Sequence, residues 1–317
     1  MDALLHSPLL QNLALLLVVI AIDSLWRWPP KYHPLTVFRL LAAGMATKVK
    51  PKSTDSPSQH RISGALGAIV LIVPFTVLTG LLVTMAEYPL FFEAVILLCV
   101  MDFAQVRWHY NAVVTALGRE KKVLAREMVS HIVARDCDRL SDIGIAKAAM
   151  ESLLLRFCYQ FCGVVLWFLI AGPVAALLYR LLLLFSWQWH WRKPGFYWFA
   201  LPVRRVTRLL SLVPAFTGAI LLALSTHPVA GFKALSQAKS RDSTSLLLAL
   251  CGGSLGIRLG GPAIYSGNMI RYSRVGGHRE VRFSDMTHCR QAVTRAVLLL
   301  LGITVVIFSA LHALYAF

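Results

Sequence analysis

Residues 252–262 (Gly-Gly-Ser-Leu-Gly-Ile-Arg-Leu-Gly-Gly-Pro) place a single cation, Arg258, in a glycine-rich break beside an apolar run. Gly261-Pro262 would end a helix there, because proline lacks an amide donor and restricts the residue before it. Arg258 would then lie one turn before a helix end with exposed carbonyls, and Tyr265 just beyond it. A guanidinium that a ligand can approach closely could bind an anionic group.

Gly252, Gly256 and Gly260 recur every fourth residue in the same stretch. On a helix they would share one flat face, which lets a second backbone approach closely. A kinked membrane helix packed through that face is the alternative interpretation, and it needs no ligand. Under both interpretations we expect a helix over 244–262.

Two carboxylates stand near the start of another apolar run. Arg135-Asp136 follows an amphipathic helix, and taken alone it would be a solvated helix junction with an Asp cap. Glu151 begins the apolar run itself, where a carboxylate costs free energy unless it is paired or solvated. Glu151 is therefore a candidate functional residue.

A third polar group follows the first apolar run, which ends at Asp23. Trp28-Pro29, His33-Pro34 and Arg39 come next. Acidic residues and tryptophans are common at the membrane–water interface, and His-Pro is usually only a turn. These residues gain significance only when they are taken together.

The elements that must position these side chains are membrane helices. The chain has 317 residues, is 57% hydrophobic and has a mean hydropathy of +0.64, too apolar for a soluble domain of this length. Apolar runs long enough to cross about 30 Å of hydrocarbon predict an all-α, polytopic membrane protein with roughly five to eight transmembrane helices. The expected spans are 9–26, 62–86, 90–104, 152–170, 173–189, 209–225, 244–262 and 294–316. The first lacks a basic n-region and a cleavage site, so we expect it to be retained.

Non-membrane segments separate these spans. The composition of 47–60 predicts a flexible linker, and 105–151 a cytoplasmic helical insertion. Gly172-Pro173 interrupts 152–189, which is either two spans joined by a tight turn or one long kinked helix with a re-entrant piece. No strand pattern is apparent.

The net charge of +17 is concentrated in particular loops. Lys and Arg gather in 27–61, 105–151, 192–208 and 258–295, and the positive-inside rule places these segments in the cytoplasm of a bacterial inner membrane. Because the charge is spread over several loops of a multi-span chain, topology explains it better than nucleic-acid binding does. We therefore expect a lipid bilayer, and no nucleic acid, as a partner.

The six cysteines show neither zinc-ligand spacing nor a disulfide framework. Cys158 and Cys162 share a helix face within an apolar run that has no neighbouring His or carboxylate. Core packing is therefore their expected role, and the sequence identifies no metal ligand.

The polar stretches together carry a family resemblance. Leu-Gly-Ile-Arg-Leu-Gly-Gly-Pro-Ala-Ile-Tyr-Ser-Gly, residues 255–267, resembles the C-terminal signature of the CobD/CbiB family of cobalamin-biosynthesis membrane proteins. The family's opening pattern is matched by Asp23, Trp28, Pro29, His33, Pro34 and Arg39. Arg135 and Asp136 match its Arg-Asp-Thr junction, with Cys137 replacing the threonine, and Glu151 matches the first glutamate of its next segment. The likeness covers nearly the whole chain, so 1–317 is expected to be a single membrane domain.

The resemblance breaks at one motif. After that glutamate the family continues with Glu-Asn-x-x-Asp-Gly, polar groups suited to metal and phosphate, whereas this chain has Leu155, Arg156, Tyr159 and Gln160. The middle third also resembles AmpE, the β-lactamase-induction membrane protein of the same superfamily. Its likeness rests on Val-Arg-Trp-His-Tyr-Asn-Ala, Leu-Arg-Phe-Cys-Tyr and Leu-Val-Pro-Ala-Phe-Thr-Gly.

The two resemblances imply different functions. The first implies an adenosylcobinamide-phosphate synthase, which uses ATP and Mg²⁺ to join adenosylcobyric acid, a corrinoid, to aminopropanol or its phosphate. Asp136 and Glu151 would then contact metal or amine, Arg258 would bind an anionic group, and ligand contacts would come from Asp23, His33, Arg39, Arg135, Gly260, Gly261, Pro262 and Tyr265. The alternative is a non-catalytic, AmpE-like membrane sensor or modulator, which the loss of the acidic motif favours.

The topology can be tested with reporter fusions or protease protection. We expect 27–61, 105–151 and 258–293 on the cytoplasmic side, because they carry the basic loops. A reporter in 105–151 that is active only outside the cytoplasm would overturn this orientation.

Overall fold

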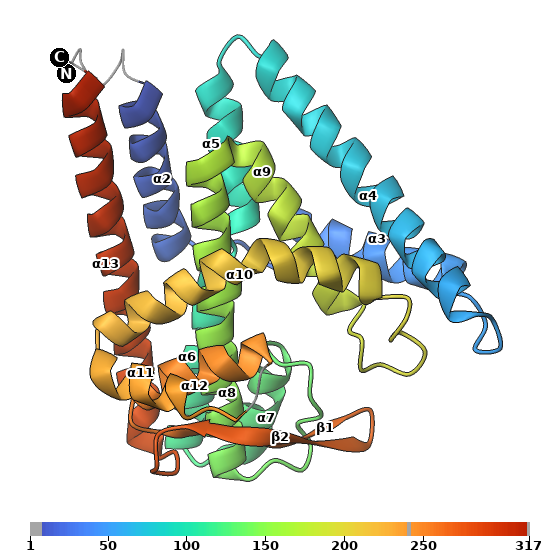
Figure 1. Cartoon of the computed structure of the whole chain (residues 1–317), viewed down its shortest axis with the longest axis vertical. Coiled ribbons are helices and arrows are strands. Elements are labelled where there is room, and N and C mark those ends of the chain that lie inside the picture. The colour runs from blue at the N-terminus through green and yellow to red at the C-terminus, as the bar shows by residue number, and fades with distance from the viewer. Residues whose placement is uncertain (1–7, 240–241, 316–317) are drawn as a thin grey trace. The chain divides into compact units, whose positions relative to one another are not determined.

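The computed structural model describes residues 8–239 and 242–315 (Figure 1). The chain divides into two compact units. Unit 1 comprises 1–102 and 163–212, and unit 2 comprises 103–162 and 213–317. Each unit is therefore assembled from two separate stretches of sequence. The expected single membrane domain thus contains two compact units, and the chain passes from one unit to the other at three points.

Unit 1 is helical. Its elements are α2 (Pro8–Leu25), α3 (Pro34–Val49), α4 (Pro57–Met85), α5 (Pro89–Met101), most of α9 (Cys162–Gln188) and the first half of α10 (Leu201–Leu224). Prolines begin α3, α4 and α5, where the missing amide would have no partner in any case. His33 and Ser56 cap α3 and α4 by accepting hydrogen bonds from backbone amides.

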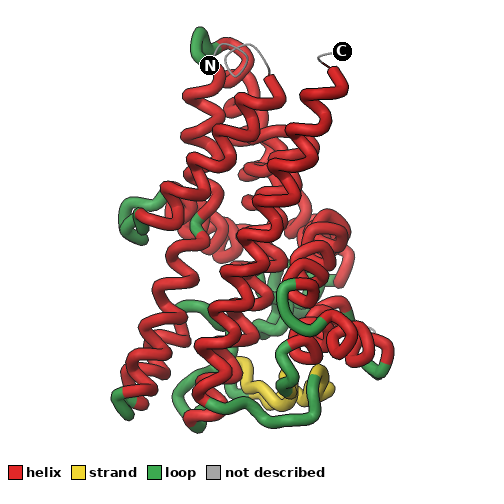
Figure 2. The backbone as a smooth tube through the Cα atoms, turned by 90° about the vertical axis from the view of Figure 1, so that its left-hand side faces the viewer, coloured by secondary structure: helices red, strands yellow, loops and turns green. Residues whose placement is uncertain are grey.

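Unit 2 contains helices and one small sheet. Its helices are α6 (Phe103–Gly118), α7 (Lys122–Ser130), α8 (Asp142–Arg156), the second half of α10, α11 (Pro228–Ser236), α12 (Ser243–Ser254) and α13 (Phe283–Tyr315), and a π-helical turn, Phe157–Phe161, follows α8. Strands β1 (Arg258–Tyr265) and β2 (Asn268–Gly276) pair antiparallel in a hairpin, drawn yellow in Figure 2.

Five helical runs are long and apolar enough to cross a membrane. They are Pro57–Met85, Pro89–Gly118, Asp142–Gln188, Leu201–Leu224 and Phe283–Leu314, and Leu9–Leu25 is a shorter apolar helix. The prediction of a polytopic membrane protein is confirmed. The expected span at 90–104 is part of the run that reaches Gly118, and Asp102 interrupts it in a left-handed conformation (φ 36°).

The run Asp142–Gln188 contains a tight turn, one of the two arrangements that its sequence allowed. Ala171 and Gly172 have non-helical backbone angles, and Gly172 has φ 77°. Gly163 and Tyr179 lie on opposite sides of this break, and the Tyr179 ring packs directly against the Gly163 backbone. The two arms are therefore antiparallel, with Trp167 stacked against Tyr179.

The expectation of a helix over 244–262, and of no strand in the chain, is wrong. Helix α12 ends at Ser254 and is too short to span a membrane, and β1 begins at Arg258. Gly256, Gly260 and Gly261 have φ of 69°, 75° and 103°, a region that a right-handed helix never uses. The three regularly spaced glycines therefore lie in a helix, a turn and a strand, and Gly261-Pro262 forms a bulge of the hairpin.

The helix ends give narrower bounds for the two segments expected to lie between membrane spans, 47–60 and 105–151. Within 47–60, α3 runs to Val49 and α4 begins at Pro57, so only 50–56 lies outside helices. Within 105–151, α6 and α8 are the ends of long apolar runs, and α7 lies between them. The segment outside the long apolar runs is accordingly 119–141.

Unit 1 contains one very close approach between backbones. A Cβ atom added to Gly64 of α4 would lie 1.9 Å from the carbonyl oxygen of Phe199. On the neighbouring helix α3, a Cβ atom added to Gly44 would meet nothing within 4 Å. Gly64 thus permits a contact that any other residue would obstruct.

We expect Gly64→Ala to lower the stability of the protein in detergent by roughly 1–3 kcal/mol, since the backbone must move to admit the methyl group. Gly44→Ala is the matched control, and it should leave the thermal unfolding midpoint unchanged or slightly raised. Equal midpoints for the two variants would show that the close approach is not required.

Candidate functional site

The residues expected to form a site separate into two groups, one in each unit. Asp23, His33 and Arg39 belong to unit 1. The others belong to unit 2: Arg135, Asp136, Glu151, Arg258, Gly260, Gly261, Pro262 and Tyr265.

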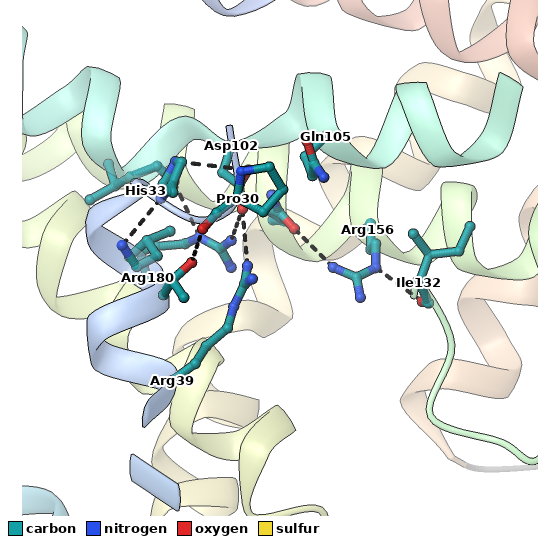
Figure 3. Close-up of polar contacts among 12 residues, drawn as sticks. Pro30, His33, Arg39, Asp102, Gln105, Ile132, Arg156 and Arg180 are labelled. Carbon is teal, nitrogen blue, oxygen red and sulfur yellow. Dashed lines mark hydrogen bonds and ion pairs between the residues drawn. The ribbon is translucent and has the colours of Figure 1, made fainter. Parts of the chain in front are cut away.

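The unit 1 group is centred on Asp102, at the end of α5. Its carboxylate accepts a hydrogen bond from Arg39 of α3 at 3.1 Å and lies 3.5 Å from the guanidinium of Arg180 of α9 (Figure 3). Arg180 also donates to the carbonyl of Val100, and its side chain is 1% exposed. A carboxylate buried in this way is stable because it is paired and hydrogen-bonded.

His33 completes this group from the N-terminus of α3. Its Nδ1 accepts a hydrogen bond from the Leu35 amide, and its Nε2 lies 3.8 Å from Asp102. Burial lowers the pKa of His33, with Arg180 and Arg39 acting in the same direction and Asp102 against it. His33 is therefore neutral at pH 7 and acts as a helix cap. Asp23 is buried near the end of α2.

The unit 2 group is centred on Glu151, on the buried side of α8. One carboxylate oxygen is paired with the guanidinium of Arg135, and the other accepts a hydrogen bond from the amide of Gly260 at 2.7 Å. Burial alone would lower the pKa of Arg135, but the charge and hydrogen bond of Glu151 outweigh it and raise that pKa. Glu151 thereby joins α8, the 131–141 loop and β1.

Asp136 binds the other end of the hairpin. Its carboxylate accepts hydrogen bonds from the amides of Ser266 and Gly267 in the turn, at 3.3 and 2.9 Å, and its amide donates to the carbonyl of Ile264. Asp136 and Glu151 thus hold β1 and its turn at two points. Tyr265, at the end of β1, packs edge-on against Tyr272 of β2.

Gly260 and Gly261 let the hairpin bend beside Glu151. A Cβ atom on Gly260 would lie 2.3 Å from the carbonyl oxygen of Ser273, so a side chain would force the strands apart. The register shifts between Gly260 and Pro262, and Pro262 is exposed on the strand. Gly261 lies at this register shift and has no side chain, so other groups can lie close to its backbone.

Two cations converge on Gly261. The position that its Cβ atom would take lies 3.8 Å from both Nζ of Lys147 and Nε of Arg274. Arg258 and Arg274 are each 3.5 Å from the exposed carboxylate of Glu280. Lys147, Arg258 and Arg274 are called the hairpin cation cluster below. With Arg135 it holds four cations against two carboxylates, Glu151 and Glu280.

The positions where the family's acidic motif is replaced serve the same unit. Arg156 donates to the carbonyl of Ile132 at 3.2 Å and reaches Gln160 (Figure 3), and Ser152 also donates to Ile132. These contacts bind the 131–141 loop to α8. The replacements therefore support the loop that presents Arg135 and Asp136.

The residues present do not form a carboxylate cage for magnesium. Among residues 8–239 and 242–315, no three His, Cys, Asp or Glu side chains group closely enough to hold a metal ion. Both oxygens of Glu151 and both oxygens of Asp136 already accept hydrogen bonds or pair with arginine. Mg²⁺ needs several oxygen ligands in near-octahedral geometry.

Sequence reasoning missed four of these residues. Arg180 is a lone charge in an apolar run, a pattern that by itself marks a functional or paired position. Lys147 lies four residues before Glu151, the spacing that places two side chains on one helix face. Asp102 lies near the end of the expected span 90–104 and was not predicted as a site residue. Arg274 carried no signal, because its strand was not expected.

Comparison with known proteins gives one consistent result. A family model described as CobD/CbiB protein matches residues 16–296. The cobalamin biosynthesis protein CobD of Chromobacterium violaceum is 27% identical over 95% of this chain and 100% of its own length. The CobD protein of Stutzerimonas stutzeri is 30% identical over 78% of this chain and 82% of its own length. No solved structure gives a significant match.

The Arg135–Glu151 pair can be tested by a double-mutant cycle. We expect Glu151→Gln to lower the free energy of unfolding by roughly 3–5 kcal/mol, because it leaves Arg135 buried without its counter-charge. The double variant Arg135→Gln/Glu151→Gln should be less destabilised than the sum of the single variants. Additive effects in denaturant unfolding would show that the pair is not coupled.

Proposed function

This chain belongs to the CobD/CbiB family of cobalamin-biosynthesis membrane proteins, and from that premise we propose that it is an adenosylcobinamide-phosphate synthase. In this reaction the carboxyl group of adenosylcobyric acid forms an amide bond with aminopropanol or its phosphate, and ATP supplies the free energy. Multi-pass membrane helices and the bacterial relatives support a location in the inner membrane.

The convergence of Lys147 and Arg274 on Gly261 is the observation that carries this proposal. Both substrates other than the corrinoid can bear phosphate groups, and phosphate oxygens are bound by guanidinium and ammonium groups. The cluster and Arg135 together exceed the carboxylates of Glu151 and Glu280 by two charges, so a bound phosphate would compensate this excess. Gly261 lacks a side chain at the point where a phosphate would approach.

Glu151 and Asp136 have a positioning role in this proposal. Glu151 holds the amide of Gly260 and so sets the bulge at Gly261 beside Lys147 of its own helix. Asp136 fixes the hairpin turn. Direct contact of Asp136 or Glu151 with metal or amine, which the resemblance implies, would compete with these partners. No step is therefore assigned to a protein-bound magnesium ion.

Magnesium would arrive with ATP as part of the substrate. The ion usually keeps several water molecules and bridges phosphate oxygens, and so it needs few protein ligands. The cations of the cluster would stabilise the negative charge that develops on the phosphate oxygens of ATP when a phosphoryl group is transferred. Arg258, the cation identified first from the sequence, would contribute from the start of β1.

Complementation tests the proposal directly. The gene should restore growth on supplied cobyric acid to a bacterium that lacks its own adenosylcobinamide-phosphate synthase. Lys147→Gln and Arg274→Gln should each reduce synthase activity in membranes by roughly 10- to 100-fold, the effect of losing one hydrogen bond to a charged group. Arg271→Gln, on the same strand and also exposed, is the matched control and should retain activity.

Two outcomes would contradict the proposal. Absence of growth with the wild-type gene, despite confirmed insertion in the membrane, would exclude the synthase reaction and favour a non-catalytic membrane modulator. Full activity in both cluster variants would remove the hairpin cation cluster from the site.

A further inference from the structure

A second group of cations lies in unit 1, on the segment that joins α9 to α10. Trp191 has the guanidinium of Arg192 4.5 Å from its ring centroid and that of Arg204 at 4.1 Å. Arg204 comes from the first turn of α10, so the ring is held between two segments. A guanidinium over an indole face is a favourable contact, and it places the charge of the arginine beside the aromatic ring.

Two further pairs come from α3 and α4. Lys50, which follows α3, lies 4.6 Å from the ring centroid of Phe196, and Arg61 of α4 lies 4.5 Å from that of Trp198. Four segments of unit 1 thus bring cations onto aromatic rings. Lys50, Arg61, Arg192 and Arg204, with Trp191, Phe196 and Trp198, are called the interfacial patch.

The part of the patch between α9 and α10 has no negative charge nearby in sequence, and Asp55 is the one acidic residue between Lys50 and Arg61. The chain contains no Asp or Glu from residue 152 to residue 241. Burial lowers the pKa of His190 to about 4, and the charges of Arg192, Lys193 and Arg204 act in the same direction. Arg205 and Arg208 are exposed in the first two turns of α10, and they add positive charge close to Arg204 in the sequence.

The patch borders surface that must face hydrocarbon. On α4, apolar side chains follow Arg61 at one to three turns and are about half exposed: Leu66 at 55%, Ile69 at 52% and Val70 at 59%. On α10, Leu209 is 75% exposed. Tryptophan and arginine beside the end of an apolar helix surface are typical of the membrane interface. The partner that meets such a border is the headgroup layer of the bilayer.

We propose that the interfacial patch binds the phosphate groups of anionic phospholipids, with the guanidinium groups on the phosphates and the rings at headgroup depth. The lipid chains then continue along the exposed apolar faces of α4 and α10. This binding is independent of the proposed synthase reaction, which uses residues of unit 2. Anionic lipid would fix the segment 189–200 against α3 and α4.

The test uses the full chain purified in a neutral detergent and titrated with phosphatidylglycerol or phosphatidylcholine. Retained lipid is counted by native mass spectrometry. The wild-type protein should prefer phosphatidylglycerol, and Arg192→Gln/Arg204→Gln/Arg205→Gln should weaken its binding at least tenfold, since each cation near a membrane surface contributes about fivefold. The control Arg119→Gln/Lys121→Gln/Arg139→Gln removes the same charge from exposed positions in unit 2 and should keep the preference.

Two further arms make the result decisive. The corresponding triple lysine variant should keep most of the preference over phosphatidylcholine, because the charge remains. Pyrophosphate at millimolar concentration should not displace the lipid; displacement would show a site for a soluble phosphate instead. Equal phosphatidylglycerol binding by the glutamine variant and the wild type would overturn the proposal, whatever the activity of either protein.

Discussion

An ionised carboxylate that is removed from water must be given hydrogen bonds and a counter-charge, and Asp102 in unit 1 and Glu151 in unit 2 are carboxylates of this kind. Asp102 holds α3 and α9 to the end of α5. Glu151 holds the 131–141 loop and β1 to α8. Apolar packing is non-directional, so these directional contacts decide where the basic side chains and the hairpin lie.

The membrane helices could be predicted because their signal is local. Apolar runs such as 62–86 and 209–225 have the required length, and Gly172-Pro173 marks a break that Tyr179 and Gly163 show to be a tight turn. The hairpin could not be predicted in this way. Apolar residues continue from α12 into a glycine pattern that also suits a helix, whereas strand pairing depends on partners outside that window.

The candidate site was predictable only as a set of residues. Glu151, Asp136 and Gly260 were identified, but the contact between Glu151 and Gly260 spans 109 positions of sequence. The sequence alone gives no reason to expect that two proposed catalytic carboxylates hold backbone amides. Arg274 shows the same limit, since its approach to Lys147 exists only once β2 has paired with β1.

The pairing of Asp102 with Arg180 has a consequence for biogenesis. A ribosome delivers Arg39 and Asp102 first, and Arg180 follows 78 residues after Asp102. Transfer of a lone arginine into a bilayer costs roughly 2.5–3.5 kcal/mol on insertion scales. This cost is lower for Arg180 if Asp102, its counter-charge, is already in the membrane. The pairing therefore favours insertion of the second arm of α9 while α5 is still within reach, which would couple the insertion of these two segments.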